Sequence, residues 1–362
     1  MTRLPAPLAA GIGAEAPRAA LEAARLQGLS HVDYPAVWAL KSAVLRAAFT
    51  FEEAAKAGGG ALVAEFDAFV AAGGEALTRF ATFEAIAAVT GATTASGFPA
   101  DLSAWDRPGV ADFAARHRRA VRWSQFLQWL AERQLAEAAA RGRAAGLGLG
   151  FYRDLAVGCA PPDPFARDGQ VWSLPPLNPI ESARLGHAPF AELIRANMAH
   201  AGALRIDHVL GLRRLFVVPD GAKGSQGAFV DQPFEDLIGQ LTLESRRAEC
   251  VVVGEDLGTV PWGFRERMAE AEVLSYQVLW FEREGRGFRS PATYPALGTA
   301  VFGSHDLATL AGWWIGDDLD EDLRLGRLEE AAAPAARAER AEEKRVLIDT
   351  LIAAGALAAD AV

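Results

Sequence analysis

Residues 203–211 read ALRIDHVLG and residues 250–258 read CVVVGEDLG, and these two segments decide the fold. Each opens with a short apolar run typical of a buried strand and ends in acidic side chains. The segments 151–158, 276–282 and 299–306 are also predicted to be strands. Helical periodicity fills the intervals, at residues 189–201, 232–246 and 262–271. This alternation predicts parallel strands joined by crossover helices.

The polar ends of the predicted strands distinguish two possible architectures. A series of strand–helix units fits either a doubly wound sheet or a (β/α)8 barrel. A barrel gathers its catalytic groups at the carboxyl ends of several strands, and Asp154, Asp207, Glu255 and Asp306 all lie at such ends. Residues 254–260, GEDLGTV, lack the glycine spacing of a dinucleotide-binding loop. We therefore predict an α/β protein of the (β/α)8 TIM-barrel type.

The first part of the chain has a different pattern. Residues 1–150 are predicted to be almost entirely helical, and a long amphipathic helix ends at the glycine-rich segment 146–150. Aromatic side chains recur in that helix at three-residue steps, which indicates core packing. They are Trp123, Phe126 and Trp129. We predict a helical insert subdomain over residues 1–120 and a barrel-type catalytic domain over residues 121–362.

Composition bounds the function. The chain has 362 residues, of which 51% are hydrophobic and 23% charged, with a formal net charge of −10. A negative charge argues against nucleic-acid binding, which depends on basic side chains. No apolar stretch approaches membrane-spanning length, and Cys159 and Cys250 lack the spacing of a zinc site or disulfide framework. We therefore expect a cytoplasmic protein with no metal, no cofactor, and no nucleic-acid or membrane partner.

Carboxylates that converge on one rim suggest cleavage of a glycosidic bond. If their strands are neighbours, Asp207 and Glu255 point into the same mouth, with Asp306 close by. Retaining glycosidases use two carboxyl groups about 5–5.5 Å apart, one as nucleophile and one as acid. Arg205 lies two residues before Asp207 and so shares its strand face. An adjacent arginine favours the ionised form of a nucleophile.

Single polar residues at strand ends are usually structural, as an ion pair or a helix cap, and Asp256 is interpreted in that way. The histidines His117, His187 and His200 show no partner in sequence, and a metal site is not supported by any spacing. The joint pattern over four strands is harder to explain by packing, because packing requires no acidic side chain at any of them.

Several segments resemble one enzyme family. LRIDHVLG (residues 204–211), GEDLG (254–258) and SHDLATLAGWW (304–314) are similar to the segments after barrel strands four, five and seven of 4-α-glucanotransferases of the amylomaltase type. These enzymes belong to the α-amylase clan. The proline-rich segment 161–179 resembles the family's PPD and GQ.W loop, and the likeness runs from about residue 31 to the C-terminus.

The resemblance implies a role for each matching residue. It implies Asp207 as nucleophile, Glu255 as general acid/base and Asp306 as transition-state stabiliser. Arg205 and His305 would bind sugar hydroxyls on the donor side, whereas Asp163, Gln170 and Trp172 would line the acceptor side. The substrate implied is maltodextrin or another α-1,4-glucan, without metal or cofactor. Trp172 also fits an ordinary loop anchor, and Trp313 and Trp314 are interpreted as packing residues.

The sequence departs from the family pattern in places. Residues 153–157 correspond to the third barrel strand, so the chain is expected to hold strands three to seven of an incomplete barrel. Only two residues stand between Gly158 and Pro161, where the family has a longer stretch, while Pro164 and Ser173 replace usual family residues. Alternatives are therefore an inactive or glucan-binding fragment, a hydrolase that uses the same carboxylates, or a chain completed by a second one.

Overall fold

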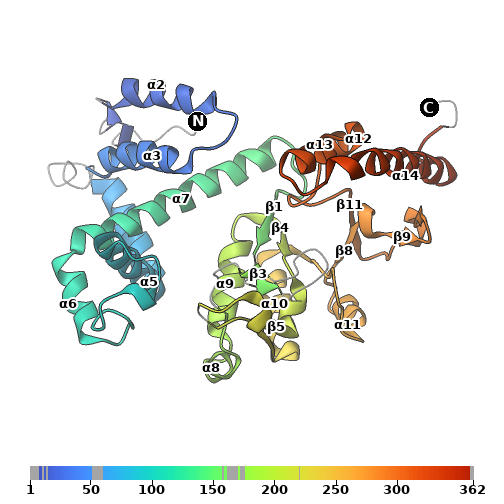
Figure 1. Cartoon of the computed structure of the whole chain (residues 1–362). Coiled ribbons are helices and arrows are strands. Elements are labelled where there is room, and N and C mark those ends of the chain that lie inside the picture. The colour runs from blue at the N-terminus through green and yellow to red at the C-terminus, as the bar shows by residue number, and fades with distance from the viewer. Residues whose placement is uncertain are drawn as a thin grey trace. The chain divides into compact units, whose positions relative to one another are not determined.

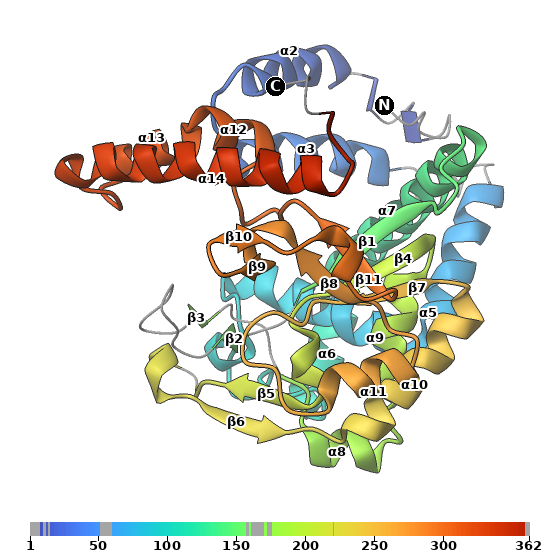
Figure 2. The same cartoon turned by 90° about the vertical axis from the view of Figure 1, so that its right-hand side faces the viewer.

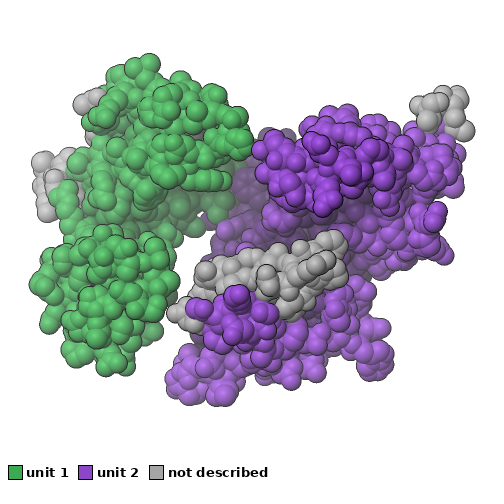
Figure 3. Space-filling model, in the orientation of Figure 1, with its two compact units in different colours: residues 1–141 green, residues 142–362 purple. Residues whose placement is uncertain are grey.

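The protein forms two compact units, and each is described by itself. The computed structural model describes residues 8–9, 12–13, 15–50, 60–156, 159–160, 170–171, 176–219 and 221–358 (Figure 1). The units comprise residues 1–141 and 142–362 (Figure 3). The sequence suggested a boundary at residue 120. The observed division lies 21 residues later because one uninterrupted helix, α7 (Arg118–Ala144), runs across the expected boundary.

Helices are the regular elements that the structure describes in the first unit, as predicted. Its helices, besides most of α7, are α2 (Ala16–Gln27), α3 (Tyr34–Phe49), α5 (Gly60–Thr90), α6 (Pro108–Arg116) and the 3-10 turn η1 (Ala95–Gly97). Proline occupies the first turn of α2, α3 and α6, where its missing N–H is tolerated. α5 is kinked at Gly74, whose φ of 53° is one that glycine adopts easily because it has no Cβ.

The aromatic stripe of α7 forms the core of this unit. Trp129 lies 5.2 Å from the ring of Phe66, and Phe126 lies 5.1 Å from that of Phe49. All of these side chains, together with Trp123, are buried in one hydrophobic cluster. The packing interpretation of the three aromatic residues is confirmed.

The second unit is built on parallel strands that lie side by side in chain order (Figure 2). They are β1 (Phe151–Leu155), β4 (Ala201–Ile206), β7 (Val251–Gly254), β8 (Ser275–Val278) and β11 (Gly298–Val301). β4 pairs in parallel with β1 and β7, and β8 pairs in parallel with β11. A parallel bridge between Val253 and Leu274, with the Gly254 N–H 2.8 Å from the Leu274 carbonyl, joins the two sets.

Helices between these strands cover one face of the sheet. α9 (Ala188–Met198), α10 (Phe234–Ala248) and α11 (Phe264–Glu270) follow β1, β4 and β7 in turn. Leu204 and Val252 point from the strands into the cluster that these helices share. The opposite face carries Val253 in a smaller cluster with the β8 side chains Tyr276 and Val278. The molecule is therefore a helix-rich α/β protein.

The second unit contains further short helices, turns and antiparallel strand pairs besides the parallel strands and α9, α10 and α11. They are α8 (Pro179–Arg184), the antiparallel pairs β2 (Cys159–Ala160) with β3 (Gln170–Val171) and β5 (Arg214–Val217) with β6 (Ala228–Asp231), the 3-10 turns η2 (Val209–Leu212), η3 (Gly224–Gln226), η4 (Leu279–Phe281), η5 (Pro291–Thr293) and η6 (Glu330–Ala332), the hairpin β9 (Arg283–Glu284) with β10 (Gly287–Phe288), and α12 (Leu310–Ile315), α13 (Asp317–Arg324) and α14 (Ala333–Ala353). The predicted strand at residues 276–282 is shorter than expected, because the chain turns into η4 after Val278.

Trp313 is a core residue in the C-terminal part of this unit. Its ring lies 4.5 Å from that of Trp280 and packs in a cluster with Leu347 of α14. The packing interpretation of Trp313 is confirmed, whereas Trp314 is partly exposed. Among the helices that the structure describes, none is both long enough and apolar enough to cross a membrane.

Candidate active site

Asp207 and Glu255 stand at adjacent positions on one edge of the sheet. Ile206 of β4 is paired in register with Gly254 of β7, so the next residue of each strand lies beside the other. The Glu255 N–H donates to the Ile206 carbonyl at 2.9 Å, and the Asp207 N–H donates to that of Leu155 at 2.9 Å. Neighbours in parallel register share a face, so both carboxyl groups rise from the same side of the sheet.

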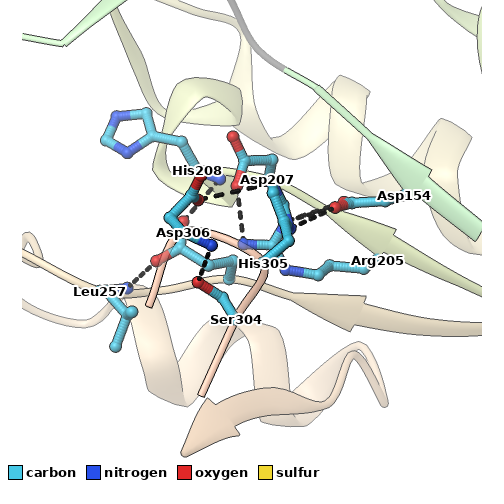
Figure 4. A network of polar contacts seen from close by, with 9 residues as sticks. Asp154, Arg205, Asp207, His208, Leu257, Ser304, His305 and Asp306 are labelled. Atoms are coloured by element: carbon cyan, nitrogen blue, oxygen red, sulfur yellow. Dashed lines mark hydrogen bonds and ion pairs between the residues drawn. The ribbon is translucent and has the colours of Figure 1, made fainter. Parts of the chain in front are cut away.

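A buried arginine joins two of the carboxylates. The Nη1 atom of Arg205 lies 2.8 Å from each carboxylate oxygen of Asp154, and its Nη2 atom lies 2.7 Å from Oδ1 of Asp207 (Figure 4). The ring of Tyr276 lies beneath the guanidinium, with 5.1 Å between the two. Burial acts to lower the pKa of Arg205, but the ion pairs with Asp154 and Asp207 outweigh it and raise that pKa. The arginine is therefore a fixed cation.

Asp154 is a site residue to which the sequence interpretation assigns no role beyond that of an acidic strand end. The register supplies the missing signal, because Asp154 pairs directly with Arg205 across β1 and β4. An acidic and a basic residue at paired positions on one face form a cross-strand ion pair. Asp154 thereby balances the charge of Arg205 and leaves Asp207 partly exposed toward the mouth of the site.

Glu255 is buried and held through both of its oxygen atoms. Oε2 accepts from the backbone N–H of His208 at 2.7 Å, and Oε1 accepts from that of Leu257 at 2.9 Å. Burial is the main cause that raises the pKa of this carboxyl; the charge of Asp207 acts in the same direction, while the two backbone hydrogen bonds oppose it. The net effect is to favour the protonated form, as a general acid requires.

The backbone at His208 explains how its N–H reaches Glu255. His208 has φ 46° and ψ 55°, which is the left-handed region that few residues other than glycine adopt. The following N–H, of Val209, donates to the Glu255 carbonyl at 2.9 Å. This turn after β4 is thus tied twice to the end of β7. Burial lowers the pKa of the His208 imidazole.

Asp306 and His305 approach the same cluster from the loop after β11. Nε2 of His305 lies 3.5 Å from Oδ2 of Asp306, and its Nδ1 lies 3.9 Å from Oδ2 of Asp154 (Figure 4). The Asp306 N–H donates to Oγ of Ser304 at 3.2 Å. Both side chains are exposed, to 74% for Asp306 and 68% for His305. The structure therefore brings the predicted donor-side residues together, with this pair at the outer margin.

Two of the predicted acceptor-side residues, Asp163 and Trp172, lie outside the described residues, and of the third, Gln170, only the backbone, in β3, is described.

Asp256, which was interpreted from the sequence as structural, is fully buried. It accepts from the N–H of Tyr276 at 3.0 Å and from Nε of Arg265 at 2.5 Å. Asp256 therefore joins the end of β7 to β8 and to α11 and does not face the other carboxylates.

Within the described ranges, no group of three or more His, Cys, Asp or Glu side chains is arranged to hold a metal ion. Cys250 is buried as a free thiol, and burial raises its pKa to about 11. His187 is also structural, since its Nδ1 lies 3.1 Å from Oγ of Ser182 and its Nε2 lies 3.4 Å from Asp236.

Fold and site together define a class. A row of parallel strands with helices on one face, and with a carboxylate pair at the carboxyl ends of two neighbouring strands, is the arrangement of α/β enzymes that place their catalytic groups on that edge. The profile of the family described as 4-alpha-glucanotransferase matches residues 12–160 and 158–359. The chain belongs to this family, as the motifs around Asp207 and Glu255 predicted.

Individual relatives agree with this assignment. The chain is 37% identical over 345 residues to the 4-alpha-glucanotransferase of Mycobacterium tuberculosis H37Rv, covering 86% of this chain and 46% of the relative. It is 37% identical over 256 residues to that of Haemophilus influenzae, covering 65% of this chain and 37% of the relative. The chain thus spans less than half the length of these two curated relatives.

Two solved structures are also similar. The amylomaltase from Corynebacterium glutamicum superposes with a TM-score of 0.74 at 31% sequence identity, covering 90% of this chain and 46% of that one. The amylomaltase from Streptococcus agalactiae, solved in complex with acarbose, superposes with a TM-score of 0.67 at 17% identity, covering 84% and 68%. The second likeness is one of fold.

Proposed function

We propose that the chain carries the catalytic centre of a 4-α-glucanotransferase, which transfers α-1,4-glucan segments between maltodextrins with retention of configuration. The observation that carries the proposal is the pair at adjacent register positions. Asp207 is ion-paired and partly exposed, whereas Glu255 is buried with a raised pKa. Two carboxyl groups in such different environments suit the two roles of double displacement.

In the first step, the Asp207 carboxylate attacks the anomeric carbon of the donor glucan. The bond from that carbon to the bridging oxygen breaks, and Glu255 gives its proton to the departing 4-oxygen. In the second step, the 4-hydroxyl of an acceptor glucan returns a proton to Glu255 and displaces Asp207 from the anomeric carbon. The fixed guanidinium of Arg205 orients the nucleophile throughout, since it is held in turn by Asp154.

The outer residues of the site would hold the sugar. We assign Asp306 to stabilisation of the transition state through sugar hydroxyls, and Arg205 and His305 to the donor subsite. Asp163, Gln170 and Trp172 are proposed for the acceptor side on the resemblance alone. The exposed position of Asp306 and His305 supports contact with a ligand, because neither is needed to fill the core.

We propose further that the five parallel strands correspond to strands three to seven of a (β/α)8 barrel, with residues 1–120 as a helical insert subdomain. Their parallel pairing in chain order, with helices on one face, supports this assignment. An incomplete barrel leaves strand edges open to pairing, so completion by a second chain is part of the proposal.

Incubation of the purified chain with maltotriose tests the activity. Transfer gives glucose together with maltodextrins longer than maltotriose. Glucose and maltose without longer products would identify a hydrolase, and unchanged maltotriose would identify a non-catalytic chain. Asp207→Asn should abolish product formation, while the matched control Asp106→Asn, at an exposed aspartate of the first unit, should leave it unchanged.

A further inference from the structure

A groove of about 690 Å³ lies between the N-terminal ends of α10 and α11. Its lining includes Arg213, Gln232, Glu235, Trp262, Arg267 and Glu270. α10 follows the strand that ends before Asp207, and α11 follows the strand that ends before Glu255. Crossover helices run opposite to their strands, so the groove opens on the same edge of the sheet as the two carboxylates.

Trp262 is the outstanding side chain of this groove. Its exposed fraction is 101%, the highest among the large hydrophobic side chains that the structure describes. Pro261 precedes it and Gly263, with φ 77°, follows it, so the chain turns sharply at the indole. An indole offers a large apolar surface with a polar N–H at one end, and its face can stack against a flat ligand at small entropic cost.

Polar side chains line much of the rest of the groove, and an ion pair and an aromatic contact hold its two helices together. Nε of Arg267 lies 2.9 Å from Oε2 of Glu235 and so joins α11 to α10, while the rings of Phe234 and Phe264 stack 5.1 Å apart behind them. This ion pair presents a donor and an acceptor group in a fixed position. The lining also carries the acidic side chains Asp236, Glu266 and Glu270, and Arg213 adds a second guanidinium.

Gln232 adds a group that points to a ligand. The residue is only 8% exposed, and its backbone N–H donates to the Arg213 carbonyl at 3.0 Å. Its side-chain Nε2 is buried and has no hydrogen-bond partner among the described residues. A buried donor without an acceptor destabilises a protein unless a ligand or water supplies one. A sugar hydroxyl seated against Gln232 would be such an acceptor.

We propose that this groove is a second binding site for α-1,4-glucan, with Trp262 as the stacking platform. The inference rests on the proposed function for the identity of the ligand. A chain of polyhydroxylated rings matches an exposed indole surrounded by acids that accept hydrogen bonds from hydroxyls and by arginines that donate to them. A glucan held here by a distant segment raises the local concentration of its other segments at the carboxylates, so the site favours long substrates over short ones.

Two measurements test the proposal. Titration calorimetry with maltoheptaose compares Asp207→Asn with Asp207→Asn/Trp262→Ala, so that turnover cannot interfere. We expect binding to weaken about tenfold in the double variant, as for truncation of an aromatic anchor. Separately, the ratio of kcat/KM for soluble amylose to that for maltotriose should fall about fivefold in Trp262→Ala, since only the long chain reaches the groove. Trp38→Ala, at an indole that is 58% exposed on α3, is the matched control and should keep both values.

The outcomes separate this inference from the proposed function. If glucan binding depends on Trp262 but the chain does not transfer maltotriose, the second binding site is supported and the proposed transferase function is contradicted. Transfer with unchanged maltoheptaose affinity and an unchanged ratio in Trp262→Ala would overturn the groove alone. Equal affinity for cellopentaose, a β-1,4-glucan, would contradict the assignment of the ligand class.

Discussion

The two halves of the candidate site are held in very different ways. Asp207 and Glu255 extend directly from paired strands, and the polar contacts that hold them are to a buried arginine and to the backbone. Asp306 and His305 lie on the loop after β11, are mostly exposed, and contact each other at 3.5 Å. The sheet therefore fixes the groups that would make and break bonds, whereas the loop carries groups that could adjust to a sugar.

This difference follows from burial. A charge taken out of water must be paired, and Arg205 meets this requirement with one carboxylate on each side, Asp154 and Asp207. These ion pairs hold the side chains of Arg205, Asp154 and Asp207 rigidly in place. Substitutions in the inner half should therefore change both stability and activity, while substitutions in the outer half should change activity alone.

The largest expected effect is on transfer in Asp207→Asn. Loss of the nucleophile should lower the rate of maltotriose disproportionation by about 10⁴-fold or more. The free energy of unfolding should fall by less than about 2 kcal/mol, because Asp154 still neutralises Arg205. Product analysis and urea denaturation check the two parts. Residual activity within about tenfold of the unmodified chain would remove Asp207 from the mechanism.

The double variant Asp154→Asn/Asp207→Asn sharpens the comparison through stability. It leaves Arg205 buried with no anionic partner, so the free energy of unfolding should fall by about 3–5 kcal/mol. Each single variant should lose much less, and the double-mutant cycle should show strong coupling. Additive losses in urea denaturation would mean that the two carboxylates do not share the arginine.

Asp306→Asn examines the outer half. Removing a carboxylate that grips sugar hydroxyls in the transition state should lower kcat by about 10²-fold. The free energy of unfolding should stay within about 0.5 kcal/mol, because the side chain is exposed and makes no buried contact. A marked drop in the melting temperature would show that this half, too, is structural.

The smallest effect is that of pH, and Glu255 determines its direction. An ordinary glutamic acid has a pKa of about 4.3. Because burial raises the pKa of Glu255, the acid form persists at higher pH, and kcat/KM should decline only as pH rises through the raised value. From about the ordinary value of 4.3 up to the raised value, the chain should lose stability relative to Glu255→Gln, since the unfolded state ionises there while the folded state keeps the proton. A profile that declines near the ordinary value of about 4.3 would contradict the buried position.

Much of this site could be predicted from the sequence, because the local patterns are explicit. Apolar runs that end in RIDH and GEDLG predicted two strands with carboxylates at their ends, and the two-residue spacing predicted that Arg205 and Asp207 share a face. The role of Asp154 could not be predicted, since it depends on the register between β1 and β4, which are distant in the sequence. The hydrogen bond from the His208 N–H to Glu255 could not be predicted either, because it requires a left-handed backbone conformation at His208 that the local sequence does not indicate. The compact unit extends to residue 141, beyond the residue 120 suggested by the sequence, because α7 continues without a break across that position.

The most direct test of the central claim traps the covalent intermediate. An α-maltosyl fluoride donor needs no acid to leave, so Glu255→Gln should still form the glycosyl ester but should lack the base that activates the acceptor. We predict that the ester accumulates in Glu255→Gln and that peptide mass spectrometry finds the sugar on Asp207. A label on another residue, or no accumulation while fluoride is released at the unmodified rate, would contradict the account.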